Sequence, residues 1–121
     1  MAIQIEFKAK TGVGSVEPSR GLAAWLSQQL TDTGIDASKP TMHDWGYEIR
    51  IMARGNEYYA GLPSRKEPGG NWHVFVDKRF SIRDRALGRA TTPMDEPMAK
   101  LIQEIITREP DFKLVRVLER V

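Results

Sequence analysis

YEIRIMARGN, residues 47 to 56, is the most informative stretch of the sequence, because apolar and polar residues alternate along it up to a turn signal. This alternation is typical of a strand with one buried face, and Gly55-Asn56 is a two-residue signal of the kind that joins tight hairpins. Further strands are expected at residues 58 to 62 and 72 to 80, separated by a loop with two prolines and two glycines. The block from residue 42 to residue 80 therefore predicts an antiparallel meander.

Helical and strand patterns flank this block on both sides. Residues 3 to 7 alternate apolar and polar side chains and predict a first strand. Leu22, Leu26 and Leu30 recur at helical spacing, and Gly34 supplies the stop of that helix. The other expected elements are a strand over residues 42 to 53, bent at Trp45-Gly46, a short helix at residues 81 to 88, a helix that starts near Thr92 and ends before Pro110, and a final strand at residues 112 to 118 with Val115 and Val117 on its core face.

The predicted order of elements is β-α-β-β-β-(short α)-α-β, which indicates the α+β class. We expect a single domain over residues 1 to 121, a usual domain length. Its expected architecture is a two-layer sandwich, in which a mostly antiparallel sheet carries two main helices on one face. By analogy this arrangement is ferredoxin-like, and a fold analogy does not itself carry a function.

Composition excludes several classes of protein. Apolar residues make up 40% of the chain, charged residues 28%, and the net charge is +2, which is typical of an ordinary soluble domain. The chain has no cysteine, so disulfides, thiolate nucleophiles and cysteine metal ligands are excluded. The first residues show no secretory leader, and no apolar stretch is long enough to span a bilayer. We therefore expect a cytoplasmic protein.

Positive charge is concentrated in the middle of the chain. Residues 37 to 90 carry ten basic and six acidic groups, and the densest run lies between residues 78 and 89. Such a run indicates an anion-binding surface that nucleic acid or another anionic ligand would occupy. Asp77 and Asp84 interrupt it, which favours a solvated face or salt bridges instead. The basic residues of this run are Lys78, Arg79, Arg83, Arg85 and Arg89.

Aromatic residues are concentrated in the central strands. Trp45, Tyr47, Tyr58, Tyr59 and Trp72 all lie there, and alternation must direct some of them to each face of the sheet. We expect Trp45 and Tyr59 to lie on the open face, away from the helices. Exposed aromatic residues beside arginines are typical of protein interfaces, although core packing is the alternative for most of these rings.

Catalytic and metal-binding motifs are sparse. His43 and His73 are the two histidines, and without cysteine they are too few for the usual zinc sites, so we expect neither a metal nor a cofactor. The chain has no Gly-x-Ser-x-Gly motif, and residues 11 to 16 lack the lysine of a phosphate loop. The remaining enzymatic hypothesis pairs His73 with Asp44. We expect His73 to be partly exposed, on the opposite sheet face from Trp72.

These patterns favour a non-enzymatic protein-interaction or regulatory module that binds a protein partner, or itself as a homodimer, through the open sheet face. No catalytic residue is assigned. Binding of nucleic acid or an anionic ligand through residues 78 to 89 is the first alternative, and a small enzyme that uses His73 and Asp44 is the second. The candidate binding residues are Trp45, Tyr59, His73, Arg79, Arg83, Arg85 and Arg89.

Overall fold

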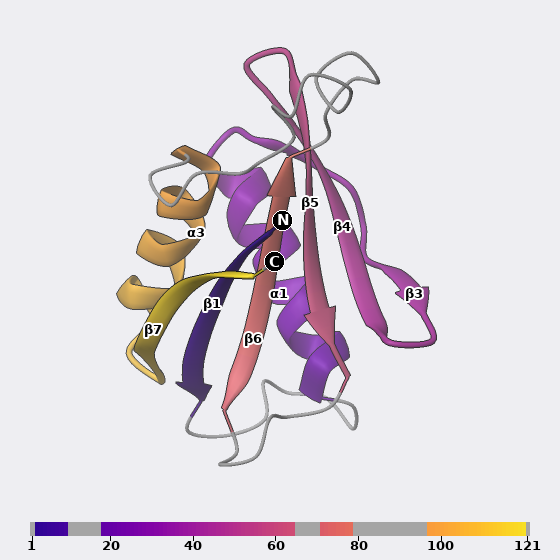
Figure 1. Cartoon of the computed structure of the whole chain (residues 1–121). Coiled ribbons are helices and arrows are strands. Elements are labelled where there is room, and N and C mark those ends of the chain that lie inside the picture. The colour runs from indigo at the N-terminus through magenta and orange to yellow at the C-terminus, as the bar shows by residue number, and fades with distance from the viewer. Residues whose placement is uncertain (1, 10–17, 65–70, 79–96, 121) are drawn as a thin grey trace.

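A computed structural model of the chain describes residues 2 to 9, 18 to 64, 71 to 78 and 97 to 120 (Figure 1). These residues form two helices and an open seven-stranded sheet in which every pair of neighbouring strands is antiparallel. The predicted α+β class is therefore confirmed. The ferredoxin-like, two-layer arrangement of these elements stays a prediction. The expected short helix at residues 81 to 88 lies outside the described residues.

The sheet has the order β2-β4-β5-β6-β1-β7, and β3 also pairs with β4. The first strand of the chain thus lies between the third strand of the meander and the last strand, as Figure 1 shows. The elements are β1 (Ala2–Ala9), α1 (Pro18–Asp32), β2 (Asp36–Ala37), β3 (Thr41–His43), β4 (Gly46–Ala53), β5 (Asn56–Pro63), β6 (Trp72–Lys78), α3 (Pro97–Arg108) and β7 (Phe112–Arg120).

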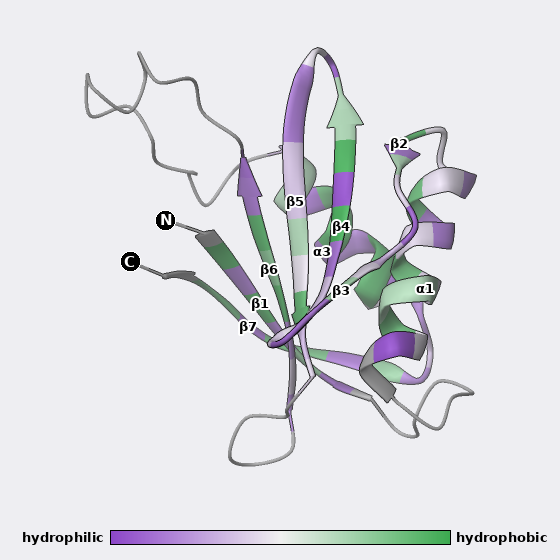
Figure 2. Cartoon of the chain, turned by 90° about the vertical axis from the view of Figure 1, so that its right-hand side faces the viewer, coloured by the Kyte–Doolittle hydropathy of each residue, from purple (hydrophilic) through white to green (hydrophobic). Residues whose placement is uncertain are grey.

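The predicted meander is confirmed as β4, β5 and β6. Hydrophobic and hydrophilic residues alternate visibly along β4 (Figure 2). The turn differs by one residue from the prediction, because Ala53 pairs with Asn56 and the loop is therefore Arg54-Gly55. Both loop residues have positive φ, 53° and 75°, as a type I′ hairpin turn requires.

The strand expected over residues 42 to 53 is wrong, because this segment forms two strands. β3 and β4 make a hairpin of their own, in which His43 pairs with Gly46 around the turn at Asp44 and Trp45. Gly46 has φ 153°, and a Cβ atom there would clash with the carbonyl oxygen of Leu62 on β5. Glycine at this position therefore lets the chain turn close against the neighbouring strand, instead of producing a simple bend.

Helix α1 ends as the sequence predicts. The amide of Ile35 donates to the carbonyl of Leu30, and the amide of Gly34 donates to the carbonyl of Thr31. Gly34 has φ 86°, so this pair of bonds is a Schellman motif. Helix α3 ends at Arg108, before Pro110. Its expected start near Thr92 lies outside the described residues.

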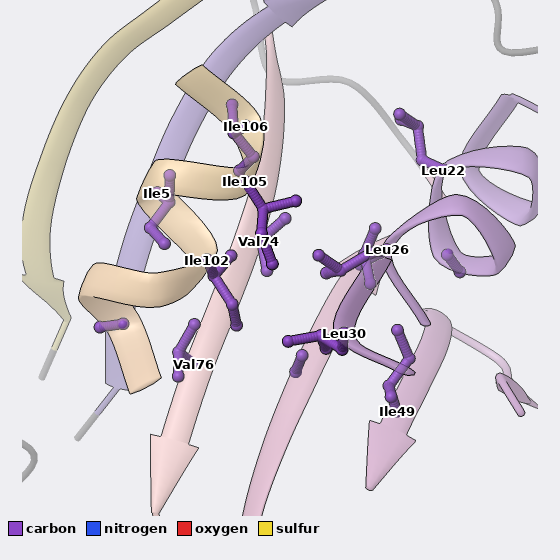
Figure 3. Packing of buried hydrophobic residues seen from close by; sticks show 14 of the residues in the cluster. Ile5, Leu22, Leu26, Leu30, Ile49, Val74, Val76, Ile102, Ile105 and Ile106 are labelled. Atoms are coloured by element: carbon purple, nitrogen blue, oxygen red, sulfur yellow. The ribbon is translucent and has the colours of Figure 1, made fainter. Parts of the chain in front are cut away.

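Apolar side chains of the sheet and of both helices form one hydrophobic core cluster. Register places Ile5 beside Val74 and Ile3 beside Val76, so their side chains share a face. In Figure 3 helix α3 lies by Ile5, Val74 and Val76, whereas helix α1 lies closer to Ile49 on β4. At one end of the core, Phe112 packs its ring against Phe7 and Trp25. The largest fully buried side chains are Ile3, Ile5, Phe7, Leu26, Leu30, Ile49, Ile51, Val74, Val76, Ile102 and Ile106.

Strand β7 contains a β-bulge opposite β1. Phe7 pairs with Leu114 but Glu6 pairs with Arg116, so Val115 is an extra residue. The predicted core position of Val115 is wrong, because this side chain is 42% exposed. Leu114 and Val117 pack against the core instead, although they are three residues apart. The bulge is what turns both of them to the same face.

Candidate functional site

The sheet face opposite the core carries polar and aromatic side chains. Because paired residues of antiparallel strands share a face, several rows of neighbours cross this surface, and three of them concern the site. Every row alternates with a row of core residues. These three rows are Thr41, Glu48, Gly61, Phe75, Gln4 and Leu118; Arg50, Tyr59 and Asp77; and His73, Glu6 and Arg116.

Trp45 is part of the β3–β4 turn, and its ring extends over this face toward Gly61. Its ring stacks on His43 with centroids 5.3 Å apart and the planes 4° from parallel. The other side of the ring approaches Gly61, where a Cβ atom would lie only 3.1 Å from Trp45 Cη2. Gly61 therefore leaves the space that Trp45 fills, and the tryptophan is still 47% exposed. Trp45 is thus a fixed but accessible aromatic surface, as the sequence predicts.

Further rings continue from Trp45 toward β1. The Cβ of Phe75 lies 3.9 Å from the Cβ that Gly61 lacks, on the opposite strand β6. Phe75 in turn meets His73 edge to face, with ring centroids 6.2 Å apart. His43, Trp45, Phe75 and His73 therefore make an aromatic row across the sheet face, exposed at its Trp45 end and buried at His73.

At the buried end, Glu6 binds two side chains from neighbouring strands. His73 Nε2 donates to Glu6 Oε1 at 3.1 Å, because a carboxylate only accepts, and Arg116 Nε donates to Oε2 at 2.6 Å. Hydrogen bonds from His73, Asn71 and Arg116 lower the pKa of Glu6 below 4.5, the first of them most strongly, whereas desolvation raises it. Glu6, His73, Asn71 and Arg116 are called the Glu6 cluster below.

The Glu6 cluster corrects the prediction for His73. We expected a partly exposed ring, but His73 is 6% exposed because Glu6 lies directly opposite it on β1. Asp44 is exposed in the β3–β4 turn, two strands away in the sheet order. The described contacts therefore join His73 to Glu6. A buried carboxylate with three partners is typical of structural networks that fix one packing arrangement.

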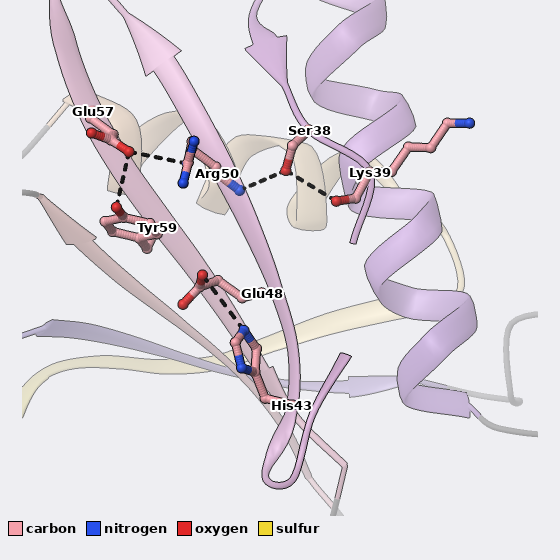
Figure 4. A network of polar contacts seen from close by, with 7 residues as sticks. All are labelled: Ser38, Lys39, His43, Glu48, Arg50, Glu57 and Tyr59. Carbon is pink, nitrogen blue, oxygen red and sulfur yellow. Dashed lines mark hydrogen bonds and ion pairs between the residues drawn. The ribbon is translucent and has the colours of Figure 1, made fainter. Parts of the chain in front are cut away.

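A third group of polar side chains connects β4, β5 and the segment after β2 (Figure 4). Glu57 accepts from the hydroxyl of Tyr59 at 2.9 Å and from Arg50 Nε at 3.1 Å. The amide of Arg50 donates to the hydroxyl oxygen of Ser38 at 2.9 Å. Tyr59 lies on the open face as predicted, but its hydroxyl is bonded and its ring is half-buried. It is a weaker candidate for binding than Trp45.

The remaining predicted residues are not tested. Arg79, Arg83, Arg85 and Arg89 lie outside the described residues, so the anion-binding hypothesis stays a prediction. Glu6 and Arg116 are the residues of the site that the sequence reasoning missed. The local signal was a charged residue in the middle of an apolar first strand, but its partners depend on strand register.

The described residues offer neither a metal site nor a membrane-spanning helix. Among the described residues, no three histidine or carboxylate side chains come close enough to hold a metal ion. Neither α1 nor α3, the helices of the described ranges, is long and apolar enough to cross a bilayer.

Comparison with known proteins does not assign the chain to a group. No protein-family model matches the sequence, and no curated protein matches it. Function is therefore argued from the geometry of the sheet face.

Proposed function

We propose that this chain is a non-enzymatic interaction module that binds a protein partner through the sheet face around Trp45. The single observation that carries this proposal is a tryptophan that is 47% exposed yet held between His43 and the space at Gly61. The proposal includes the two-layer arrangement expected from the sequence. With both helices on one face, the part of the opposite face around Trp45 is available to a partner.

The surroundings of Trp45 support an interface. His43 on β3 and Arg50 on β4 are both exposed on the same sheet face. An exposed tryptophan on the same face as an arginine is typical of a protein interface. Stacking on His43 also fixes the tryptophan before a partner arrives, which reduces the entropy that binding must overcome.

The Glu6 cluster supports a non-enzymatic reading of the same face. His73 is buried and uses Nε2 on Glu6, so a substrate on the sheet surface would not reach its ring directly. A general base must lie within hydrogen-bond reach of the proton that it removes. Under this proposal the Glu6 cluster fixes His73, which contacts Phe75 in the aromatic row, and the cluster takes no part in catalysis.

Replacement of Trp45 by alanine tests the proposal. Removal of a central interface tryptophan costs about 2 kcal/mol or more in binding, roughly 30-fold in Kd. Self-association is measured by sedimentation over a range of concentrations, and a different partner by affinity capture with matched wild-type and Trp45→Ala baits. Gly61→Val is the second variant, because the added side chain displaces the ring and leaves Trp45 in the sequence.

Val115→Ala is the matched control, since Val115 is similarly exposed on the distant strand β7. We expect Trp45→Ala and Gly61→Val to weaken the same association while Val115→Ala leaves it unchanged. Equal behaviour of all three variants in correctly folded protein would refute the proposed interface.

The nucleic-acid alternative keeps a separate test. It depends on Arg79, Arg83, Arg85 and Arg89, and it requires an affinity that falls steeply with added salt. Absence of salt-dependent binding to single- or double-stranded nucleic acid would remove it.

A further inference from the structure

A small cavity lies on the other side of the molecule from Trp45, in the region of the core. Its volume is about 150 Å³, and it lies between the β4–β5 hairpin, Ile35 in the connection from α1 to β2, and the first turns of α3. Tyr58 and Met98 are buried, and Ile35 and Leu101 are half-buried beside them. The lining side chains used below are Ile35, Ala53, Arg54, Tyr58, Met98 and Leu101.

The size and lining of this cavity define the body of a ligand. A cavity of roughly 150 Å³ has room for a molecule of the size of benzene. Among the described lining residues, Arg54 is the charged one, and the others are aliphatic, thioether or proline side chains and the phenol of Tyr58. The cavity therefore fits one six-membered ring, or a branched chain of similar volume.

Arg54 adds one positive charge to this otherwise apolar lining. Its side chain is exposed. In the described part of the chain no acidic side chain forms an ion pair with it, whereas Arg50 is paired with Glu57 on the same hairpin. A guanidinium group in this situation binds a carboxylate through charge-assisted hydrogen bonds.

The backbone gives a second reason to single out Arg54. It occupies the first loop position of a type I′ turn at φ 53°, where asparagine, aspartate and glycine are favoured. A left-handed conformation is unfavourable for arginine, and such strain is concentrated at functional sites. The turn itself therefore does not explain why arginine stands here, whereas an anionic ligand in the cavity does.

We infer that this cavity binds a small monocarboxylate whose body is one ring or a branched chain of similar size. The body contacts Met98, Leu101 and Ile35, and the carboxylate meets the guanidinium of Arg54. The site is independent of the surface around Trp45.

Benzoate is the probe that tests this inference. Methyl groups of Ile35, Met98 and Leu101 are followed in carbon–proton correlation spectra while benzoate is added to the full chain. We expect saturable shifts of these three methyl groups. Benzamide has the same shape without the charge and should bind about tenfold more weakly, because a hydrogen bond to a charged group is lost. Acetate has the charge without the ring and should give no saturable shift.

Arg54→Gly separates ligand binding from folding. Glycine suits the left-handed turn better than arginine, so this variant should melt at a temperature equal to or above that of wild type. It should lose the preference for benzoate over benzamide. Leu101→Trp fills the cavity and should abolish binding of both, while Trp45→Ala should leave both affinities unchanged.

Two results would overturn the inference. One is the absence of saturable methyl shifts with benzoate. The other is unchanged benzoate affinity in folded Arg54→Gly protein, which would show that the guanidinium does not hold the carboxylate. Because Trp45→Ala is measured in the same series, failure of this site is distinguished from failure of the proposed interface.

Discussion

The two faces of strand β1 are both buried, but they are built from opposite kinds of side chain. Ile3, Ile5 and Phe7 face the helices and are fully enclosed by apolar neighbours. Gln4 and Glu6 face the other way and are only 3% and 5% exposed, so they are nearly as well buried. The two faces of β1 are therefore similar in burial. They differ in that only the polar face has side chains that need hydrogen-bond partners.

This difference teaches how each face stabilises the fold. The apolar face gains from removal of hydrocarbon from water, which is insensitive to pH and tolerant of small shifts in geometry. The polar face gains only where each donor and acceptor has a partner, since an unpaired buried polar atom is destabilising. Glu6 meets that requirement, but Gln4 Oε1 has no hydrogen-bond partner among the described residues.

The largest expected effect lies on the apolar face. Ile5→Ala removes a side chain that is fully buried against Val74 and should lower the free energy of unfolding by about 3 kcal/mol. Urea denaturation of both proteins, with the slope checked for two-state behaviour, measures the loss. A loss near that of a surface substitution would break the comparison, because it would mean that β1 is not the centre of the core.

A smaller effect is expected from Glu6→Gln on the polar face. The amide keeps the shape but loses the charge-assisted bonds to His73 and Arg116, which should reduce stability by about 2 kcal/mol at neutral pH.

The pH dependence sharpens this prediction. The pKa of Glu6 is lowered in the folded protein, so its contribution is fully present above 4.5 and is lost as the pH falls from 4.5 toward the lowered value. Glu6→Gln should therefore remove part of the acid sensitivity in that window, whereas Glu104→Gln on the exposed side of α3 should not. Identical stability curves against pH for wild type and Glu6→Gln would contradict the role of the cluster.

The smallest effect should be of opposite sign. Gln4→Leu replaces a buried side chain whose carbonyl oxygen is unpaired by an apolar one of similar size, next to Phe75 and Leu118 on the same face. Stability should rise by about 1 kcal/mol, because the buried unsatisfied acceptor is removed. The thermal midpoint measures this gain. A clear loss would instead indicate that Gln4 Oε1 has a partner.

Local sequence patterns predicted the elements well. Alternation gave the strands of the meander, and Gly34 marked the end of α1 by supplying the positive φ that the Schellman motif needs. The β4–β5 turn was predicted one residue too late in the sequence, because arginine is not expected in a left-handed position. The β3–β4 hairpin was missed because its turn depends on the close approach of Gly46 to β5, which is a tertiary contact.

The candidate site was only partly predictable. Exposure of Trp45 on the open face was expected from strand alternation, but the pairing of His73 with Glu6 joins residues 67 positions apart. Pairing at that distance depends on register, and register in β7 depends on the extra residue Val115. Neither the register nor the bulge can be deduced from a window of neighbouring residues. The alternation in the first strand therefore predicted that Glu6 faces solvent.

The interrupted edges of the sheet also bear on how this protein avoids aggregation. One edge consists of two short strands, β2 and β3, separated by a segment with Lys39 and Pro40, and at the other the bulge at Val115 distorts β7. Long, regular edges are templates on which further copies of a chain add strand by strand into fibrils. Both described edges are irregular, so the protein can display an exposed tryptophan on its face while strand addition at its sides stays unfavourable.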